Sequence, residues 1–290
     1  MYTLFKEKLQ KKIRQKLPEK KKKEKTIMMK IGVMPSSFRV PFKEAVILAR
    51  DMGAKGLQPY VTGGELTPDL TKDERKAILK YVKDNGLEFS AVCGDFGSAY
   101  FSAEDNEAEV KRMMSMMDLA LDFDTRIVTT HIGHVPDDEN DPKYINTVKT
   151  IEKLGKYGES IGVVFATETG PEMAVVLKGI LEKADTKNAK VNLDPANFVM
   201  CAGQDPVEAV HILKNYIVHT HAKDGIKTGP TSYLEKPLGQ GGVPYVEYVS
   251  ALKEEGYDGF LTIERECGDT PYDDIKLAYD FLTEILKKIY

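Results

Sequence analysis

Residues 163–194 read VVFATETGPEMAVVLKGILEKADTKNAKVNLD and contain the unit from which most of the chain is built. Val163–Thr167 and Lys190–Leu193 are short, mainly apolar runs with the length of buried strands, and the pattern between them is helical. Each run is followed by a carboxylate, Glu168 after the first and Asp194 after the second. Two parallel strands joined by a helix are therefore predicted for this stretch.

The same alternation of strand and helix extends outward from this unit, from Lys30 to the end of the chain. The predicted strands are Ile31–Met34, Gly56–Pro59, Glu88–Cys93, Ile127–His131, Val163–Thr167, Lys190–Leu193, Ile217–Ala222 and Gly259–Ile263. They are mostly continuous apolar runs, as expected for strands covered on both faces. Eight uninterrupted units, with no GxGxxG loop after the first strand, favour closure over an open doubly wound sheet. We expect an α/β fold, a (β/α)₈ TIM barrel, over residues 29–290.

Several helix starts are visible in the sequence. Thr71-Lys-Asp-Glu74 has the spacing of a capping box, in which a threonine and a glutamate three residues later satisfy free backbone N–H groups. Asp205-Pro206 and Thr270-Pro271 each place a capping residue before a proline at the first helical position. These signals predict helices beginning near residues 72, 206 and 271.

The composition is that of a soluble protein, with 42% hydrophobic and 30% charged residues. No apolar stretch approaches the roughly 18–20 residues that cross a bilayer. The three cysteines, Cys93, Cys201 and Cys267, are scattered and odd in number, which argues against disulfides and thiolate zinc sites. They indicate a reducing compartment, so we expect a cytoplasmic protein.

Charge is unevenly distributed along the chain. Residues 1–28 hold eleven Lys/Arg against three Glu, a net charge of +8, which leaves −12 on the rest of a chain whose total is −4. An acidic body is a poor binder of nucleic acid, so no nucleic-acid partner is expected. Leu9, Ile13 and Leu17 have helical spacing, so the extension is predicted to be either disordered or a short helix. A basic arm that binds a membrane or RNA is the functional alternative.

Metal-competent side chains stand at the ends of four consecutive predicted strands. Glu168, Asp194, His221 and Glu264 end the fifth to the eighth strand, and His131 ends the fourth. Each alone could be a helix cap or a solvated group. In barrels of this class, however, chemistry gathers at the carboxyl ends of the strands, so the side chains should meet in one volume.

Three carboxylates gathered in one volume are costly unless a cation compensates their charge. We therefore predict one divalent metal ion bound by Glu168, Asp194, His221 and Glu264. Oxygen donors with one imidazole suit Mn²⁺ best, and Mg²⁺, Co²⁺ or Zn²⁺ would also fit.

The same strand ends carry a resemblance to a known family. The segments are Thr167-Glu168-Thr169, Leu193-Asp194, His221-Ala-Lys223-Asp224, Gly239-Gln-Gly241-Gly-Val243 and Ile263-Glu264. In this order the chain resembles the sugar phosphate isomerase/epimerase family of xylose isomerase-like TIM barrels, over residues 29–290. That family includes ketose 3-epimerases, ribulose-phosphate-type epimerases, hydroxypyruvate isomerases and inosose dehydratases.

The resemblance implies the same metal ligands, Glu168, Asp194, His221 and Glu264. It also implies that Glu168 and Glu264 are the catalytic pair, which exchange protons with the substrate from opposite sides. Members of the family often pair through barrel helices, so a homodimer or homotetramer is expected.

Further substrate-binding residues follow from the resemblance and from their positions. His131 and Lys223 are expected to line the pocket. Asn197 stands where many members have a histidine; it can hydrogen-bond a hydroxyl group but cannot titrate. Lys227 and the glycines of Gly239–Gly242 either contact a substrate phosphate or are a solvated charge and a turn.

Chemically, such a site suits a small sugar, a sugar phosphate or a related hydroxyketone. A metal polarises the carbonyl and stabilises the enediolate formed when a neighbouring proton leaves. Return of the proton to the same carbon gives epimerisation, and return to the adjacent carbon gives isomerisation. Loss of a β-hydroxyl would make the protein an inosose-type dehydratase. The sequence does not distinguish these outcomes.

Three other functions fit less well. A glycoside hydrolase could use Glu168 and Glu264 but leaves Asp194 and His221 without a role, and the chain has no Trp for sugar stacking. An AP endonuclease-like phosphodiesterase needs more histidines than five can easily supply, and the acidic body opposes it. A non-catalytic barrel would be expected to lack at least one ligand.

Overall fold

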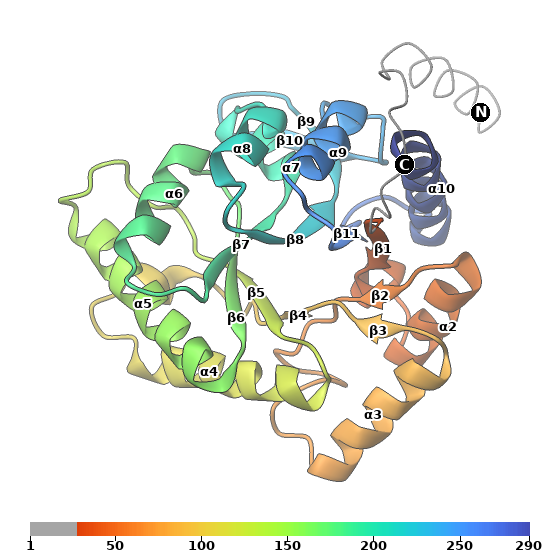
Figure 1. Ribbon diagram of the computed structural model, residues 1–290, viewed down its shortest axis with the longest axis horizontal. Coiled ribbons are helices and arrows are strands. Elements are labelled where there is room, and N and C mark those ends of the chain that lie inside the picture. Colours follow the sequence, from red (N-terminus) through yellow and green to blue (C-terminus); the bar gives the residue numbers. More distant parts are fainter. Residues whose placement is uncertain (1–27) are drawn as a thin grey trace.

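A computed structural model describes residues 28–290 (Figure 1). The prediction for the basic extension therefore lies almost wholly outside the described residues, which include only its last residue, Met28. The described chain forms a nearly closed barrel of parallel strands surrounded by helices, as the sequence predicts.

The barrel sheet contains nine strands within residues 28–290. In chain order they are β1 Lys30–Val33, β2 Gly56–Leu57, β3 Glu88–Phe89, β4 Val92–Cys93, β5 Ile127–His131, β6 Val164–Glu168, β7 Ala189–Leu193, β8 Ile217–Ala222 and β11 Phe260–Ile263. Their order in the sheet is β3-β2-β1-β11-β8-β7-β6-β5-β4, and every pairing is parallel.

β3 and β4 are two halves of one strand position of the barrel; each of these positions is called a stave. The segment 88–93, predicted as one strand, pairs with β2 through its first half and with β5 through its second half. An isolated parallel bridge between Tyr60 and Cys93 joins the β2 side to β4. The sheet thus has the eight staves that the sequence predicts.

A long helix follows each stave and packs around the sheet (Figure 1). These helices are α2 Phe42–Met52, α3 Lys72–Asp84, α4 Glu107–Asp122, α5 Pro142–Ile161, α6 Ala174–Lys183, α8 Pro206–Leu213, α9 Tyr245–Glu254 and α10 Pro271–Ile289. Shorter turns are the 3₁₀ segments Pro35–Phe38 and Ala99–Ser102, the one-turn α7 Pro195–Asn197 and the π-turn Phe198–Ala202.

The predicted caps are found at two of the three helix starts. Thr71 accepts a hydrogen bond from the Glu74 N–H, and the Glu74 carboxylate accepts one from the Thr71 N–H, which completes the capping box. Asp205 accepts from the Val207 N–H at the start of α8. Thr270 precedes Pro271 as predicted, but its side chain makes no capping hydrogen bond.

One pair of strands is absent from the sequence predictions. After β8 the chain forms an antiparallel hairpin of β9 Asp224–Lys227 and β10 Tyr233–Lys236, which packs on the π-turn 198–202. The hairpin lies beside the carboxyl ends of the staves because it directly continues β8. Within residues 28–290, no helix combines the length and apolarity that crossing a bilayer would require.

Candidate metal centre

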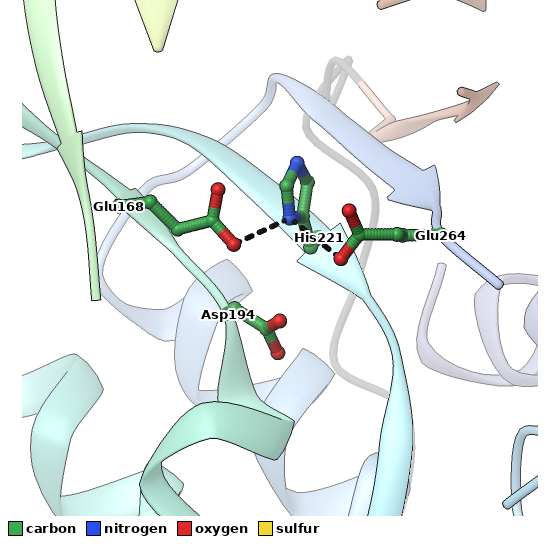
Figure 2. A group of neighbouring side chains, drawn as sticks. All are labelled: Glu168, Asp194, His221 and Glu264. Carbon is green, nitrogen blue, oxygen red and sulfur yellow. Dashed lines mark hydrogen bonds and ion pairs between the residues drawn. The ribbon is translucent and has the colours of Figure 1, made fainter. Parts of the chain in front are cut away.

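Four side chains from neighbouring staves converge at the carboxyl end of the barrel (Figure 2). Glu168 is the last residue of β6, Asp194 follows β7, His221 lies in β8, and Glu264 follows β11. One ligand atom from each lies within 4.8 Å of the others, and all four residues are buried. In the described part of the chain this is the single group of three or more His, Cys, Asp or Glu side chains that could hold a metal ion.

The imidazole of His221 lies between two of the carboxylates. Its Nδ1 is 3.1 Å from Glu168 Oε1 and 3.4 Å from Glu264 Oε2. Figure 2 shows Glu168 and Glu264 on opposite sides of this ring, with Asp194 beside them. The arrangement leaves one nitrogen and several oxygens facing a common centre.

Asp194 uses only one of its two carboxylate oxygens within the protein. Its Oδ1 accepts hydrogen bonds from the N–H groups of Ala196, at 2.7 Å, and Asn197, at 3.3 Å, which caps α7. Its Oδ2 is buried and has no hydrogen-bond partner among the described residues. A buried oxygen without a partner costs free energy. A cation bound there would remove that cost, so the donor set fits a divalent metal.

The carboxylates control the protonation of their neighbours. Burial alone would lower the pKa of His221, but Glu168 and Glu264 raise it well above its ordinary value. Burial likewise opposes the charge on Lys223, yet Glu264 and Asp194 raise its pKa. Burial raises the pKa of Asp194. Without a metal, the group thus holds protons that a divalent ion would displace.

His131, predicted to line the pocket, also reaches this group. Its Nε2 is 3.4 Å from Glu168 Oε1, and its Nδ1 is 2.7 Å from Asp95 Oδ2. The negative charge of Glu168 and the hydrogen bond to Asp95 outweigh burial and raise the pKa of His131 to about 10. Asp95 was not predicted, although it follows β4 just as the predicted ligands follow their own strands.

Asn197 and Lys223 each contact one of the two glutamates. Asn197 Nδ2 donates to the carbonyl oxygen of Thr169 at 2.9 Å and lies 3.5 Å from Glu168 Oε1. Lys223 Nζ donates to Glu264 Oε2 at 3.0 Å and also to Glu266. Both side chains are buried beside the candidate metal ligands, and their contact with a substrate stays a prediction.

Lys227 lies outside the four-residue group. It is exposed on β9, and its Nζ donates to the carbonyl oxygen of Cys201 at 3.1 Å. A role in binding substrate stays a prediction for this residue.

The glycine-rich loop 239–243 binds a carboxylate of the protein itself. Asp224 Oδ2 accepts from the N–H groups of Gly239 and Gly241, each at 2.9 Å, and Oδ1 accepts from Val243 at 3.1 Å. Asp224 Oδ1 also accepts from the Gly225 N–H at 2.8 Å. Because these N–H groups are occupied, the structure favours the interpretation of this loop as a turn over that of a phosphate site.

Two further residues near the site were missed in the sequence. Gln58, just after β2, is fully buried, and its Oε1 lies 2.9 Å from His221 Nε2. Glu172 is buried, its Oε1 accepts from the Gly170 N–H at 3.0 Å, and its Oε2 has no partner within residues 28–290. Burial raises the pKa of Glu172 to about 7. A polar residue inside the apolar run Gly56–Pro59 was the available signal for Gln58.

Comparisons with known proteins bear on this site. A family model described as xylose isomerase-like TIM barrel matches residues 46–285. Among curated proteins, the chain is 26% identical to the uncharacterized protein MJ1311 of Methanocaldococcus jannaschii over 61% of this chain and 63% of that protein. It is 24% identical to the uncharacterized protein MJ1188 of the same organism, over 82% of this chain and 88% of that protein.

Solved structures share the whole barrel. A xylose isomerase domain protein from Planctomyces limnophilus is 26% identical, with a TM-score of 0.80, and the match covers 92% of this chain and 99% of that one. The probable 3-DHS dehydratase AsbF from Bacillus anthracis is 22% identical, with a TM-score of 0.73, over 88% and 99%. A D-psicose 3-epimerase solved with D-fructose is 17% identical, with a TM-score of 0.70, over 90% and 99%.

Proposed function

We propose that this chain, which belongs to the xylose isomerase-like TIM barrel family, is a divalent-metal-dependent isomerase or epimerase of a small sugar, sugar phosphate or related hydroxyketone. The observation that carries the proposal is the buried group of Glu168, Asp194, His221 and Glu264 within 4.8 Å. Its place at the carboxyl ends of four neighbouring staves is where this fold carries its chemistry.

The four residues of this group would hold the metal, with Mn²⁺ as the proposed ion and Mg²⁺, Co²⁺ or Zn²⁺ as alternatives. Support for a divalent ion comes from the unpartnered Oδ2 of Asp194. A protein of this fold from Mycobacterium smegmatis, 17% identical with a TM-score of 0.71, was solved in complex with magnesium. When bound, the metal polarises the substrate carbonyl and stabilises the negative charge that develops on its oxygen.

Glu168 and Glu264 are proposed as the proton-transfer pair. Because they lie on opposite sides of the group (Figure 2), one can remove the proton next to the carbonyl and the other can return one from the opposite side. The Lys223 ammonium, 3.0 Å from Glu264 Oε2, lowers the pKa of that carboxyl and helps to keep it ionised. His131, Asn197, Lys223 and Lys227 are proposed to hydrogen-bond the substrate oxygens.

Dehydration is a second candidate reaction, and the Asp95–His131 pair favours it. His131 lies 3.4 Å from Glu168, so it is a third proton-carrying group beside the proposed base. It could protonate a departing β-hydroxyl while Glu168 holds the proton taken from carbon. One solved structure of this fold is named as a probable dehydratase.

The test is to load the protein with Mn²⁺ and incubate it in D₂O with ketoses, ketose phosphates and inososes. NMR would identify which C–H exchanges and whether the product is an epimer, an isomer or a dehydrated molecule. We expect exchange at a carbon next to the carbonyl, abolished by EDTA. Activity that survives EDTA, or no exchange with any compound of the panel, would count against the proposal.

A further inference from the structure

A layer of buried, uncharged polar side chains adjoins the candidate metal group. It is built from side chains of six different staves, and all are at most 7% exposed. Its members are Gln58, Ser90, Thr129, Asn192, His219 and Thr262. Such a layer is costly to bury unless its groups are mutually hydrogen-bonded, so the pattern of those bonds is informative.

We propose that Gln58 is a positioning residue that fixes the tautomer and orientation of His221 for metal binding, an inference that rests on the proposed metal function. The Gln58 Oε1 lies 2.9 Å from His221 Nε2, on the edge of the ring away from the carboxylates. The opposite nitrogen, Nδ1, faces Glu168 and Glu264. A metal on Nδ1 requires the ring proton on Nε2, where Gln58 can accept it.

The surroundings of Gln58 fix its side chain in this orientation. Its Nε2 donates to Thr129 Oγ1 at 2.8 Å, which directs its carbonyl oxygen toward His221. Its backbone N–H donates to the carbonyl oxygen of Val33 at 3.1 Å, which ties it to β1. Its side-chain amide nitrogen and its backbone are therefore held by two strands, β5 and β1, that carry no proposed metal ligand.

The other neighbour of His221 Nε2 cannot take the same role. Asn192 Nδ2 is 3.1 Å from this nitrogen, but the Asn192 Oδ1 lies 2.8 Å from Nδ1 of His219. Its amide nitrogen therefore faces His221 and Glu168 Oε2, the latter at 3.4 Å. Among the described residues, Gln58 thus supplies the acceptor and Asn192 supplies only a donor.

A neutral amide has a chemical consequence at this position. A carboxylate behind a metal-bound histidine would add a fourth negative charge to a group that already holds three. Gln58 accepts the same hydrogen bond without that charge. It orients the ligand while leaving the balance between three carboxylates and one cation unchanged.

The experiment measures the affinity of the metal-free protein for Mn²⁺ and Co²⁺ by isothermal titration calorimetry. Gln58→Leu keeps the approximate volume and removes the acceptor, and we expect it to raise the Kd by about 10–100-fold. Gln58→Glu can only accept at this position, and we expect it to bind at least as tightly as the native protein. The matched control is Ser90→Ala, which loses a 3.3 Å contact with His219 and a hydrogen bond to the Leu57 carbonyl oxygen but removes no partner of His221.

A second readout reports the tautomer directly. In Zn²⁺-loaded protein, long-range ¹H–¹⁵N NMR should show His221 with a protonated Nε2 and a metal-bound Nδ1, and Gln58→Leu should broaden or shift these signals. If Gln58→Leu does not fold, the double variant Gln58→Leu/Thr129→Val is used instead. It removes both members of the Gln58–Thr129 hydrogen bond, so the Thr129 hydroxyl is not left buried without its partner.

The outcomes separate the two proposals. If the native protein binds neither ion, the metal function fails and this inference fails with it. If the native protein binds but Gln58→Leu binds equally well, only the role of Gln58 is overturned. If Gln58→Leu and Gln58→Glu weaken metal binding equally, the proposed role of Gln58 is also overturned, because altered packing alone would then explain the effect.

Discussion

The Glu168 carboxylate contacts four other side chains. Its Oε1 lies 3.1 Å from His221 Nδ1, 3.4 Å from His131 Nε2 and 3.5 Å from Asn197 Nδ2. Its Oε2 lies 3.4 Å from Asn192 Nδ2. Polar side chains therefore contact both carboxylate oxygens and hold them in position for the proposed role as a general base.

Glu168→Gln and Glu264→Gln should each remove proton transfer. An amide keeps the size of the side chain but cannot take up a proton, so we expect C–H exchange in D₂O to fall by about 10²–10⁴-fold or more. Glu284→Gln on α10, whose carboxylate contacts Lys287 3.2 Å away, is the control that should exchange normally. Substantial turnover by either site variant would refute the two-carboxylate scheme.

Lys227→Ala should act differently, on binding more than on chemistry. Its ammonium is exposed and contacts only a backbone carbonyl among the interactions identified for it, so it is proposed to meet substrate oxygens. Loss of one such contact should raise KM by about 5–30-fold with little change in kcat. Steady-state kinetics with the best substrate of the panel would measure this, and a large fall in kcat would assign the lysine another role.

Glu172 should make the stability of the metal-free protein depend on pH. Burial raises its pKa to about 7 from 4.5, so folding disfavours its ionised form. Its contribution to stability is therefore full below about pH 4.5 and is lost as the pH rises through about 7. Glu172→Gln cannot ionise and should gain about 2 kcal/mol relative to the native protein between pH 5 and pH 8.

Urea unfolding of both proteins in EDTA at the two pH values would measure this difference. The Gln side chain can still accept from the Gly170 N–H, so the variant should fold. A difference in unfolding free energy that is the same at pH 5 and pH 8 would show that Glu172 does not titrate in this range.

Among the elements, the loop 239–243 packs tightly against the side chain of Asp224. A Cβ added at Gly241 would lie 2.1 Å from Asp224 Oδ1. Gly241→Ala should therefore break the hydrogen bonds that hold the loop and destabilise the protein by about 2–4 kcal/mol. Thermal unfolding would measure it against Gly63→Ala, where an added Cβ meets nothing within 4 Å. Equal melting temperatures for the two variants would contradict the close packing of this loop.

The sequence predicts elements well where their signal is local. The apolar runs that became β5, β6, β7 and β8 end within one residue of their predicted limits, because a buried parallel strand is a continuous apolar segment. The hairpin β9–β10 was missed because DGIKTGPTSYLEK has no such run. The interruption between β3 and β4 separates the half that pairs with β2 from the half that pairs with β5, and no local pattern encodes these long-range pairings.

The same distinction applies to the site. Glu168, Asp194 and Glu264 stand out as charges ending apolar runs, so their gathering in a barrel could be predicted. Gln58 and Asp95 act through contacts with residues at least 36 positions away along the chain. Those contacts depend on the register of the staves and on loop paths, so only the folded chain reveals them.

For the whole molecule, metal binding should appear as added stability. An ion that binds only the folded state at 100 times its Kd adds about 2.7 kcal/mol to the free energy of unfolding. We expect Mn²⁺ to raise the melting temperature and EDTA to reverse the increase. Asp194→Asn should lose most of this gain, because it removes the charge from the carboxylate whose Oδ2 has no partner in the described part of the chain.

Asp205 has a local structure similar to that of Asp194 and provides the control for the Asp194→Asn variant. Asp205 also precedes a proline and caps a helix, α8, through its side chain. Asp205→Asn should keep the full Mn²⁺ response in differential scanning fluorimetry, since both variants retain a cap but only Asp194 belongs to the metal group. An equal response of Asp194→Asn and the native protein would place the ion elsewhere.

The division of one stave into β3 and β4 has a mechanical consequence. Each half is tied to a different neighbour, and the Tyr60–Cys93 bridge joins the two sides across the gap. All four proposed ligands stand on staves away from this seam. The strands that carry the proposed ligands, β6, β7, β8 and β11, pair directly with one another, so the pairings that set the relative positions of those ligands do not include the seam.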